Sequence, residues 1–420
     1  MKKDIAVVVQ TLVQFYNIRN GIDELKKKNI TCDIYVPTYE DSEGFKEIYD
    51  ATYNKIVDMG YPVKRKATST EYKILLEAYP IDHIINIKHK YRLNYLYGSS
   101  VGIKPNICLL PDFYLHYDGV LLYNYEESEY LSAYCKTFLI GNLKFKNFFK
   151  KQNDTGNKKR ILYLPTYGKS SDIDCTINLV EKLRKKYVVY IKAHHGTDFL
   201  KEEKFKTELL KKSCDLYFDS SQNIIDLLSE ADLVLSDNSG AIFDSIYAGV
   251  PVVIFSKDVN RNKINDDFNT KQFELVKNGI IPYTSDPSDI EKIIKEGLEN
   301  STLKKQMKYR DENFYCPDDK LIDFINVISL FLKDKIDKKY KTLHDRLMNY
   351  YDDLKKENIK VINNYDKLNY LYKKSEEEKK DIYEKLKNIT QQNKLLDNKV
   401  NRLYMKIRSK LIFGGKDGKD

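Results

Sequence analysis

The stretch from Asp232 to Phe255, DLVLSDNSGAIFDSIYAGVPVVIF, decides the fold. It opens with a short apolar run, 233–235, which predicts a buried strand. Turn-forming residues follow, and apolar residues then recur at helical spacing until Gly249 and Pro251 end the helix. A second apolar run, 252–255, completes a strand–helix–strand unit. Such units build parallel sheets that are covered by helices.

The loop inside this unit consists of five small polar residues: Ser236, Asp237, Asn238, Ser239 and Gly240. In open α/β sheets the ligand crevice lies at the carboxyl ends of the strands, and a helix that starts there offers free N–H groups to an anion. We therefore interpret the loop as a phosphate site. The alternative is that these residues only cap the helix, as Ser, Asp and Asn commonly do. Five of them exceed what one cap requires.

Strands and helices alternate throughout the first 332 residues. In the first part we expect strands at 5–9, 32–36, 83–87, 107–110, 119–123 and 137–140, and helices at 18–28, 42–59 and 126–134. The polar segment 150–160 is the predicted linker. Beyond it we expect strands at 161–164, 188–191, 216–218, 233–235 and 252–255, and helices at 175–186, 201–212, 223–230, after Gly240, 287–299, 303–311 and 320–332.

This alternation predicts two doubly wound, Rossmann-like α/β domains, 1–149 and 158–332, with residues 320–332 able to cross back onto the first. Two such domains, each donating loops from its strand ends, form the GT-B arrangement of nucleotide-sugar enzymes. That step is an argument from fold, and a fold hosts many functions.

The C-terminal stretch differs from the rest in its periodicity. Apolar residues from Ile382 to Ile407 follow a heptad repeat interrupted by Asn393, and an earlier seam runs from Ile336 to Leu371 with a stutter between the two. We expect a parallel two-stranded coiled coil at 333–413, hence a homodimer, and a disordered tail at 414–420. The alternative is a helix folded back on the domains, but globular helices seldom exceed about 25 residues.

The net charge of +9 belongs to this C-terminal stretch. Residues 333–420 contain 24 basic and 15 acidic residues, which leaves 47 of each in the rest of the chain. A neutral globular part lacks the basic patch of a nucleic-acid-binding protein, so we expect no nucleic-acid partner. The six Cys residues are widely spaced and form no C-x-x-C pair, as in reduced cytosolic proteins.

The apolar run at the N-terminus is too short for a signal peptide, and no run of 18 apolar residues occurs. We expect a cytoplasmic protein. Near the C-terminus, basic residues from Lys406 to Lys410 precede Leu411, Ile412 and Phe413. This pattern suits either contact with the inner face of the cytoplasmic membrane or a frayed helix end, and the second reading is the simpler one.

Two other strand ends carry chemistry. The segment 161–168, ILYLPTYG, ends in a loop that contains Thr166. The residues GKS at 168–170 look like the end of a phosphate-binding P-loop motif. We reject a P-loop, because Tyr163 stands where that motif needs Gly. The segment 188–197, VVYIKAHHGT, places Lys192, His194 and His195 after a strand, where His titrates near neutral pH. No Cys pair or acidic cluster completes a metal site there, so we expect no metal.

We interpret a third segment, 88–98 (KHKYRLNYLYG), as a connection between two strands of the first domain. From it Arg92 would reach a phosphate across the cleft between the domains.

Several of these segments together resemble the CDP-glycerol glycerophosphotransferase family of teichoic-acid and capsule synthesis. The resemblance covers about 85–320 and rests on GNLKFKNFF (141–149), ILYLPTYG, IKAHHGT (191–197), residues 227–255 and FYCPDD (314–319). Many members also carry a Trp-His-Gly-Thr motif in the first domain, which this sequence does not have.

The resemblance implies that CDP-glycerol binds the second domain, with its pyrophosphate on the Ser236–Gly240 loop and Thr166 and its ribose near Asp244. An acceptor hydroxyl, on a lipid-linked or polymeric glycan, then attacks the β-phosphate and CMP leaves. His194 corresponds to the family's C-domain His and would act as general base or phosphate donor, with His195 beside it and Lys192 assisting. It implies no cofactor and no obligatory metal, because positioning and charge drive phosphoryl transfer.

Two alternative functions remain at this stage. A GT-B glycosyltransferase or a UDP-N-acetylglucosamine 2-epimerase-like enzyme also places a Ser-Gly turn and an acidic helix residue over a nucleotide. A scaffold whose coil carries the function, with a vestigial nucleotide domain, belongs to a different class altogether. Binding of CDP-glycerol, of UDP-sugars or of neither separates the three.

Overall fold

The computed structural model divides the chain into two compact units, 1–348 and 349–420. It describes residues 2–38, 43–66, 68–78, 87–96, 114, 116–133, 135–151, 158–168, 171, 173–200, 203–237, 239–256 and 271–336 of the first unit and 356, 357, 359, 360 and 367 of the second. These last five are helical. Residues 333–336, at the start of the predicted coiled coil, form a turn and a bend and not a helix. The remainder of the predicted coiled coil, the 414–420 tail and the strand predicted at 107–110 lie outside the described residues, as does most of the strand predicted at 83–87.

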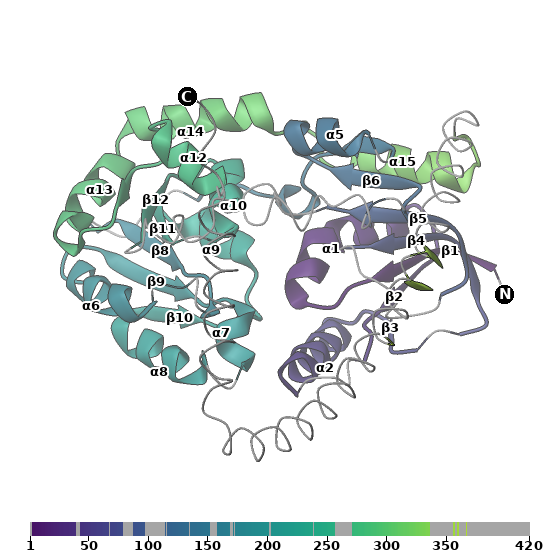
Figure 1. The fold of residues 1–420 in the computed structure, drawn as a ribbon, viewed down its shortest axis with the longest axis horizontal. Helices are drawn as coiled ribbons and strands as arrows, with labels where there is room; N and C mark the ends of the chain where they lie inside the picture. Colours follow the sequence, from purple (N-terminus) through teal and green to yellow (C-terminus); the bar gives the residue numbers. More distant parts are fainter. Residues whose placement is uncertain are drawn as a thin grey trace, which may run out of the picture. The chain divides into compact units, whose positions relative to one another are not determined.

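The first sheet has seven strands in the order β3-β2-β1-β4-β5-β6-β7, and neighbouring strands pair in parallel (Figure 1). The strands are β1 (Lys2–Val8), β2 (Cys32–Tyr35), β3 (Val63–Lys64), β4 (Glu71–Glu77), β5 (His89–Tyr95), β6 (Gly119–Leu122) and β7 (Thr137–Leu139). The accompanying helices are α1 (Leu12–Lys27), α2 (Glu43–Asp58) and α5 (Tyr125–Leu131). The order reverses between β1 and β4, as in a doubly wound domain.

The sequence-based assignment of the first sheet was incomplete at its centre. Strands β4 and β5 were not predicted, and the segment 88–98, interpreted as a connection, is largely strand β5. The β4 sequence EYKILLE and the β5 sequence HKYRLNY mix charged with apolar residues and so do not read as buried strands. They are nonetheless largely buried at their carboxyl halves.

The second sheet has six parallel strands in the order β10-β9-β8-β11-β12-β13 (Figure 1). The strands are β8 (Arg160–Leu164), β9 (Val188–Lys192), β10 (Leu216–Phe218), β11 (Leu233–Ser236), β12 (Val252–Phe255) and β13 (Tyr283–Thr284). The helices are α6 (Ile173–Leu183), α7 (His195–Phe199), α8 (Lys204–Ser213), α9 (Ile224–Glu230), α10 (Ala241–Ala248), α12 (Lys271–Lys277), α13 (Ile290–Gly297) and α14 (Asn300–Asn313). The prediction of a second α/β sheet is confirmed.

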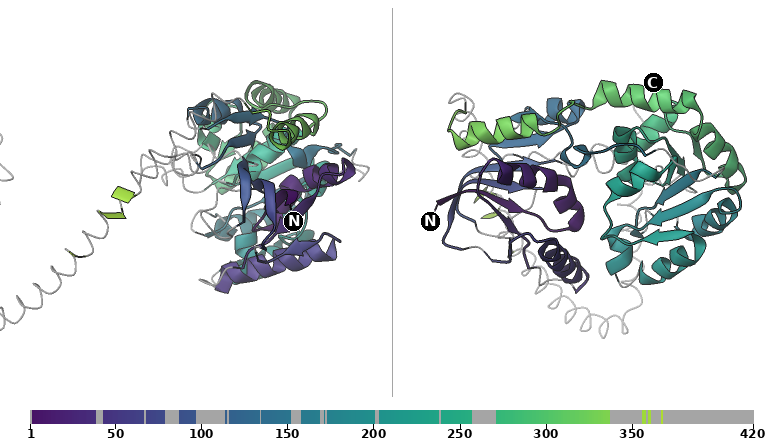
Figure 2. Two further views of the ribbon diagram at one scale, coloured as in Figure 1. Left: turned by 90° about the vertical axis from the view of Figure 1, so that its right-hand side faces the viewer. Right: turned by 180° about the vertical axis from the view of Figure 1, so that it is seen from behind.

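Helix α15 (Ile322–Leu332) crosses back to the first sheet, as its sequence allowed. Its residues Phe324, Ile328 and Phe331 are buried in the same core as α1 and β4, and Figure 2 shows the ribbon of the first unit from two further sides. The ring of Phe324 lies so close to Gly21 of α1 that a Cβ there would be 2.9 Å from it. Helix α15 therefore packs in the first core, although it follows the second sheet in the chain.

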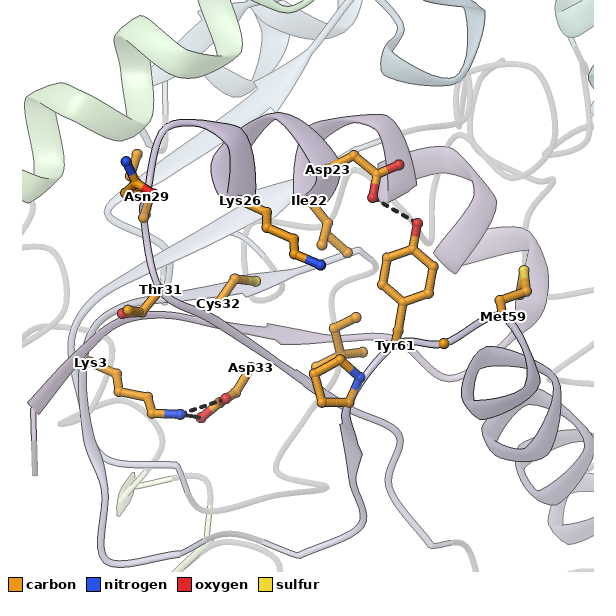
Figure 3. A pocket seen from close by; sticks show the side chains of 14 residues that line it. Lys3, Ile22, Asp23, Lys26, Asn29, Thr31, Cys32, Asp33, Met59 and Tyr61 are labelled. Carbon is orange, nitrogen blue, oxygen red and sulfur yellow. Dashed lines mark hydrogen bonds and ion pairs between the residues drawn. The ribbon is translucent and has the colours of Figure 1, made fainter.

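A cavity of about 630 Å³ lies in the first domain at the amino ends of β1 and β2 (Figure 3). Two polar pairs line it: Tyr61 donates to Asp23 over 2.7 Å, and Lys3 lies 2.8 Å from Asp33. Ligand crevices of α/β sheets lie at the opposite edge, at the carboxyl ends of the strands. This cavity is thus separate from the predicted site.

None of the helices described here is long and apolar enough to cross a membrane.

Candidate active site

The second sheet reverses its strand order at the adjacent strands β8 and β11. The chain passes from β8 outward to β9 and β10 and then returns to β11 beside β8. Leu164 pairs with Ser236, so the two strands end level at the same edge, as the sequence predicted. Ligands of open α/β sheets bind at such a switch point. The loops after β8, β9 and β11 therefore form the candidate site.

Two residues of the predicted phosphate loop hold the neighbouring loop in place. The buried carboxylate of Asp237 accepts the backbone N–H of Thr166 at 2.9 and 3.1 Å. The hydroxyl of Ser236 lies within strand β11 and donates to the Leu164 carbonyl over 2.7 Å. Both side chains were predicted to contact the ligand. This is corrected, because both are buried and bonded to the loop and strand next to them.

The start of α10 is the remaining part of the predicted loop. The Ser239 hydroxyl accepts the N–H of Ala241, the first residue of α10, over 3.3 Å. Gly240 is the N-cap residue and has no side chain to bond the helix. Asn238 lies outside the described residues. The helix ends at Gly249, as predicted, in the left-handed conformation with φ 68°.

His194 and His195 stand at the start of α7, directly after β9. The Nδ1 atom of His194 accepts the N–H of Gly196 over 3.1 Å. A neutral imidazole whose Nδ1 accepts a hydrogen bond carries its proton on Nε2. The imidazole also stacks on the ring of Tyr167 from the β8 loop, with centroids 4.3 Å apart and planes 12° from parallel. His194 is thus fixed in both tautomer and orientation.

Lys192 ends strand β9 and has an unusually acidic ammonium. Burial lowers its pKa to about 8, although the carboxylates of Asp198, Asp219 and Asp244 act in the opposite direction. Asp198 is itself held by the hydroxyl of Tyr217 at 2.7 Å and the N–H of Ser220 at 2.6 Å. These partners join the loops after β9 and β10.

Asp244, in the first turn of α10, pairs with Lys144. The Nζ of Lys144 lies 2.5 Å from Oδ1 of Asp244, and the two side chains are 5% and 16% exposed. Lys144 belongs to the short helix η2 (Leu143–Phe145). Nothing in the sequence marks Lys144 as a site residue, although it lies in the GNLKFKNFF segment that carries part of the resemblance.

Arg92 does not belong to this site. It lies in the middle of β5, and its guanidinium forms a two-pronged pair with Glu77 of β4 over 2.8 and 3.2 Å. It also packs over the ring of Tyr117 at 4.9 Å. The prediction that Arg92 reaches a phosphate across the cleft is therefore corrected: its charge is engaged within the first sheet.

The segment that carries the three loops matches a known family. Residues 142–320 match the model of the family described as CDP-Glycerol:Poly(glycerophosphate) glycerophosphotransferase. Residues 142–320 belong to this family. The chain is accordingly a transferase of the CDP-glycerol glycerophosphotransferase type, and it moves glycerol phosphate from CDP-glycerol.

The glycerophosphotransferase segment contains the whole candidate site. It starts two residues before Lys144 and ends before α15, so the three loops and Asp244 all lie inside it. Arg92 lies outside. Because the match names the donor, the glycosyltransferase and epimerase alternatives lose support.

Solved structures confirm the GT-B-like pair of α/β domains. A variant of the wall teichoic acid polymerase TagF is 15% identical with a TM-score of 0.54, covering 79% of this chain and 89% of that one. A second TagF structure is 15% identical with a TM-score of 0.51, covering 80% and 90%. At this identity the likeness concerns the fold alone. No curated protein sequence matches the chain significantly.

Among the described residues, no group of three His, Cys, Asp or Glu side chains is placed to hold a metal ion.

Proposed function

We propose that this glycerophosphotransferase extends a cell-surface polymer of the teichoic-acid or capsule type, with CDP-glycerol bound at the carboxyl ends of β8, β9 and β11. The observation that carries the proposal is the meeting of these three loops at the switch point, inside the segment that matches the family. TagF, whose fold the chain shares, is a wall teichoic acid polymerase, which supports a polymeric acceptor.

The donor would bind as follows. Its pyrophosphate lies over the start of α10, where the positive end of the helix dipole favours an anion, beside the loop that holds Thr166. The ammonium of Lys192 supplies positive charge, and Asp244 accepts a ribose hydroxyl. The acceptor hydroxyl oxygen then forms a bond to the β-phosphorus while the bond from that phosphorus to the bridging oxygen breaks. CMP leaves with the electron pair of the broken bond.

His194 is better suited to donate a hydrogen bond than to act as general base. Gly196 N–H occupies the Nδ1 lone pair, so neutral His194 presents Nε2–H. A donor at this position stabilises negative charge on the transferring phosphate. The proton of the acceptor hydroxyl then passes to another group, and His195, the first residue of α7, remains a second candidate.

Release of nucleotide tests the donor. The purified full-length chain is mixed with CDP-glycerol, CDP-ribitol, UDP-sugars and CMP-sialic acid in separate reactions, with a polyol-phosphate polymer as acceptor. We expect CMP from CDP-glycerol alone. Turnover of a UDP-sugar would support the glycosyltransferase alternative, and no binding of any donor would support the scaffold.

Substitution of His194 tests its role. His194→Ala is expected to lower kcat by about 10²- to 10⁴-fold with folding intact. His194→Gln, whose side-chain amide still donates, is expected to retain more activity than the Ala variant. Full activity of His194→Ala would remove His194 from the mechanism.

We also propose that catalysis needs no bound metal. Lys192 and the α10 start would supply the charge that a metal provides in other phosphoryl transferases. Activity in excess EDTA is expected to equal activity in Mg²⁺, and a loss reversed by Mg²⁺ would contradict this.

We propose that the stretch after residue 336, within the predicted segment 333–413, forms a parallel dimeric coil that carries the enzyme to the inner face of the cytoplasmic membrane, where a lipid-linked acceptor would lie. The heptad seam supports the dimer, and the basic, apolar C-terminus supports the membrane contact. Truncation after residue 336 should convert a dimer to a monomer in sedimentation and abolish binding to anionic vesicles. An unchanged mass and unchanged vesicle binding would refute both parts.

A further inference from the structure

Tyr167 lies directly on the imidazole of His194. The residue is 38% exposed, yet its ring stands parallel to the histidine, with centroids 4.3 Å apart and an interplanar angle of 12°. Tyr167 comes from the β8 loop and His194 from the end of β9, so the stack joins two strand ends. Exposure to solvent alone does not hold a ring in one rotamer, so the parallel contact with His194 depends on the surroundings of Tyr167.

Gly196 provides one part of that support. A Cβ at Gly196 would lie 2.4 Å from Cδ2 of Tyr167 and 2.7 Å from its Cγ, a distance that real Cβ atoms do not reach. The tyrosine ring thus rests on the glycine backbone. The same residue donates its N–H to Nδ1 of His194. Gly196 therefore has two functions. Its backbone makes room for the Tyr167 ring, and its N–H selects the tautomer of the His194 imidazole.

Asp237 provides the other part. Its carboxylate, 1% exposed, accepts the N–H of Thr166, the residue immediately before Tyr167. The backbone from which Tyr167 projects is therefore anchored to strand β11. The contacts run in sequence from Asp237 to Thr166, from there to the ring of Tyr167 and then to His194.

We propose that Tyr167 is a positioning residue that holds His194 with its Nε2–H directed at the donor phosphate, and that the Tyr167 ring can stack there only because residue 196 is a glycine. The stack restricts rotation of the imidazole, and a flipped ring would place a carbon against Gly196 N–H and lose that hydrogen bond. This inference rests on the role proposed above for His194. It predicts that the stacked ring, more than the phenol hydroxyl, determines the rate of transfer.

Kinetics provide the first test. Tyr167→Leu is expected to lower kcat about tenfold, as befits the loss of one aromatic pair, while KM for CDP-glycerol changes less than twofold. Tyr167→Phe keeps the ring and is expected to restore kcat to near the wild-type value. Gly196→Ala should resemble Tyr167→Leu. Tyr130→Leu, at an exposed tyrosine of the first domain, is the matched control and should be neutral.

A spectroscopic test does not depend on turnover. In protein labelled with ¹³C-histidine, the ring protons of His194 should be shifted upfield by Tyr167 and identified by their loss in His194→Gln. Tyr167→Leu should move them downfield, and Tyr167→Phe should not. Unshifted resonances together with a wild-type kcat in Tyr167→Leu would overturn the proposal. If the wild type releases no CMP from CDP-glycerol, the proposed function fails, and the resonances still report whether the stack exists.

Discussion

Lys144 Nζ lies 2.5 Å from Asp244 Oδ1 and joins the short helix η2 to the first turn of α10. Both side chains are largely removed from water, so each charge depends on the other. The pair lies where the donor ribose is proposed to bind. Lys144 thereby orients the carboxylate that the ribose would meet.

Removing Lys144 should weaken donor binding and the fold together. In Lys144→Met the Asp244 carboxylate is left nearly buried without its cation, which costs about 3 kcal/mol. We expect KM for CDP-glycerol to rise about tenfold and the urea midpoint to fall. Lys146→Met is the control, because Lys146 pairs with Glu24 over 3.0 Å at a more exposed position. Unchanged KM and midpoint in Lys144→Met would contradict the assignment.

Arg92 should matter for stability and not for chemistry. Its pairing with Glu77 is buried, so Arg92→Met should lower the free energy of unfolding by about 3 kcal/mol. The specific activity of the folded fraction should stay within a factor of about two. The double variant Arg92→Met/Glu77→Leu should recover stability, since it leaves no unpaired charge. A stable Arg92→Met protein without activity would restore Arg92 to the active site.

The lowered pKa of Lys192 predicts that activity falls at alkaline pH. With its pKa lowered to about 8, the ammonium that would contact the donor is lost as the pH rises through that value. The plot of kcat/KM against pH, which reports on the free enzyme, should therefore decline above about pH 8. In Lys192→Arg the charge persists, and the decline should move to higher pH. A common alkaline limb in both proteins would assign it to another group.

The lowered pKa of Lys192 also makes the stability of the fold depend on pH. The folded pKa lies below the ordinary value of 10.5, so between about pH 8 and 10.5 the unfolded chain binds a proton here that the folded chain does not. Stability from this group therefore rises with pH across that window. Chemical denaturation should show a smaller rise in Lys192→Met than in the wild type, and equal slopes would contradict the shift.

Asp334 should fasten the end of α15 to the first sheet. Its carboxylate accepts from Lys73 and Lys90 at 2.7 Å and from Tyr91 at 2.8 Å, and these donors hold its pKa well below its usual range. Asp334→Ala should speed amide exchange in α15 without changing CMP release. Glu312→Ala, at an exposed position of α14, is the control. Because the carboxylate stays ionised, the effect should persist down to about pH 4.

Much of the fold can be predicted from the sequence, and the strands that were missed share a physical cause. The second sheet was predicted nearly complete because its strands are uninterrupted apolar runs between turn residues. Strands β4 and β5 were missed because their charged residues find partners only after folding. Arg92 looks like a solvated cation in the sequence, and it becomes a strand residue once Glu77 stands on the neighbouring strand.

The candidate site divides in the same way. Spacing placed Thr166, Lys192, His194 and the Ser236–Gly240 loop at strand ends, because parallel strands end at a common edge. It did not reveal that Asp237 bonds Thr166, that Tyr167 covers His194 or that Lys144 meets Asp244. Each of these pairs joins residues from different strand ends or domains.

The sequence by itself determined the alternation of strands and helices, the switch-point loops and the likeness to a glycerophosphotransferase, since these depend on local periodicity and on residues close together in the chain. Only the tertiary structure decided which polar side chains face a ligand and which bind their neighbours. That choice depends on burial and on partners brought from distant parts of the chain. Ser236 and Asp237 show the reason, because their buried oxygens had to be paired inside the protein.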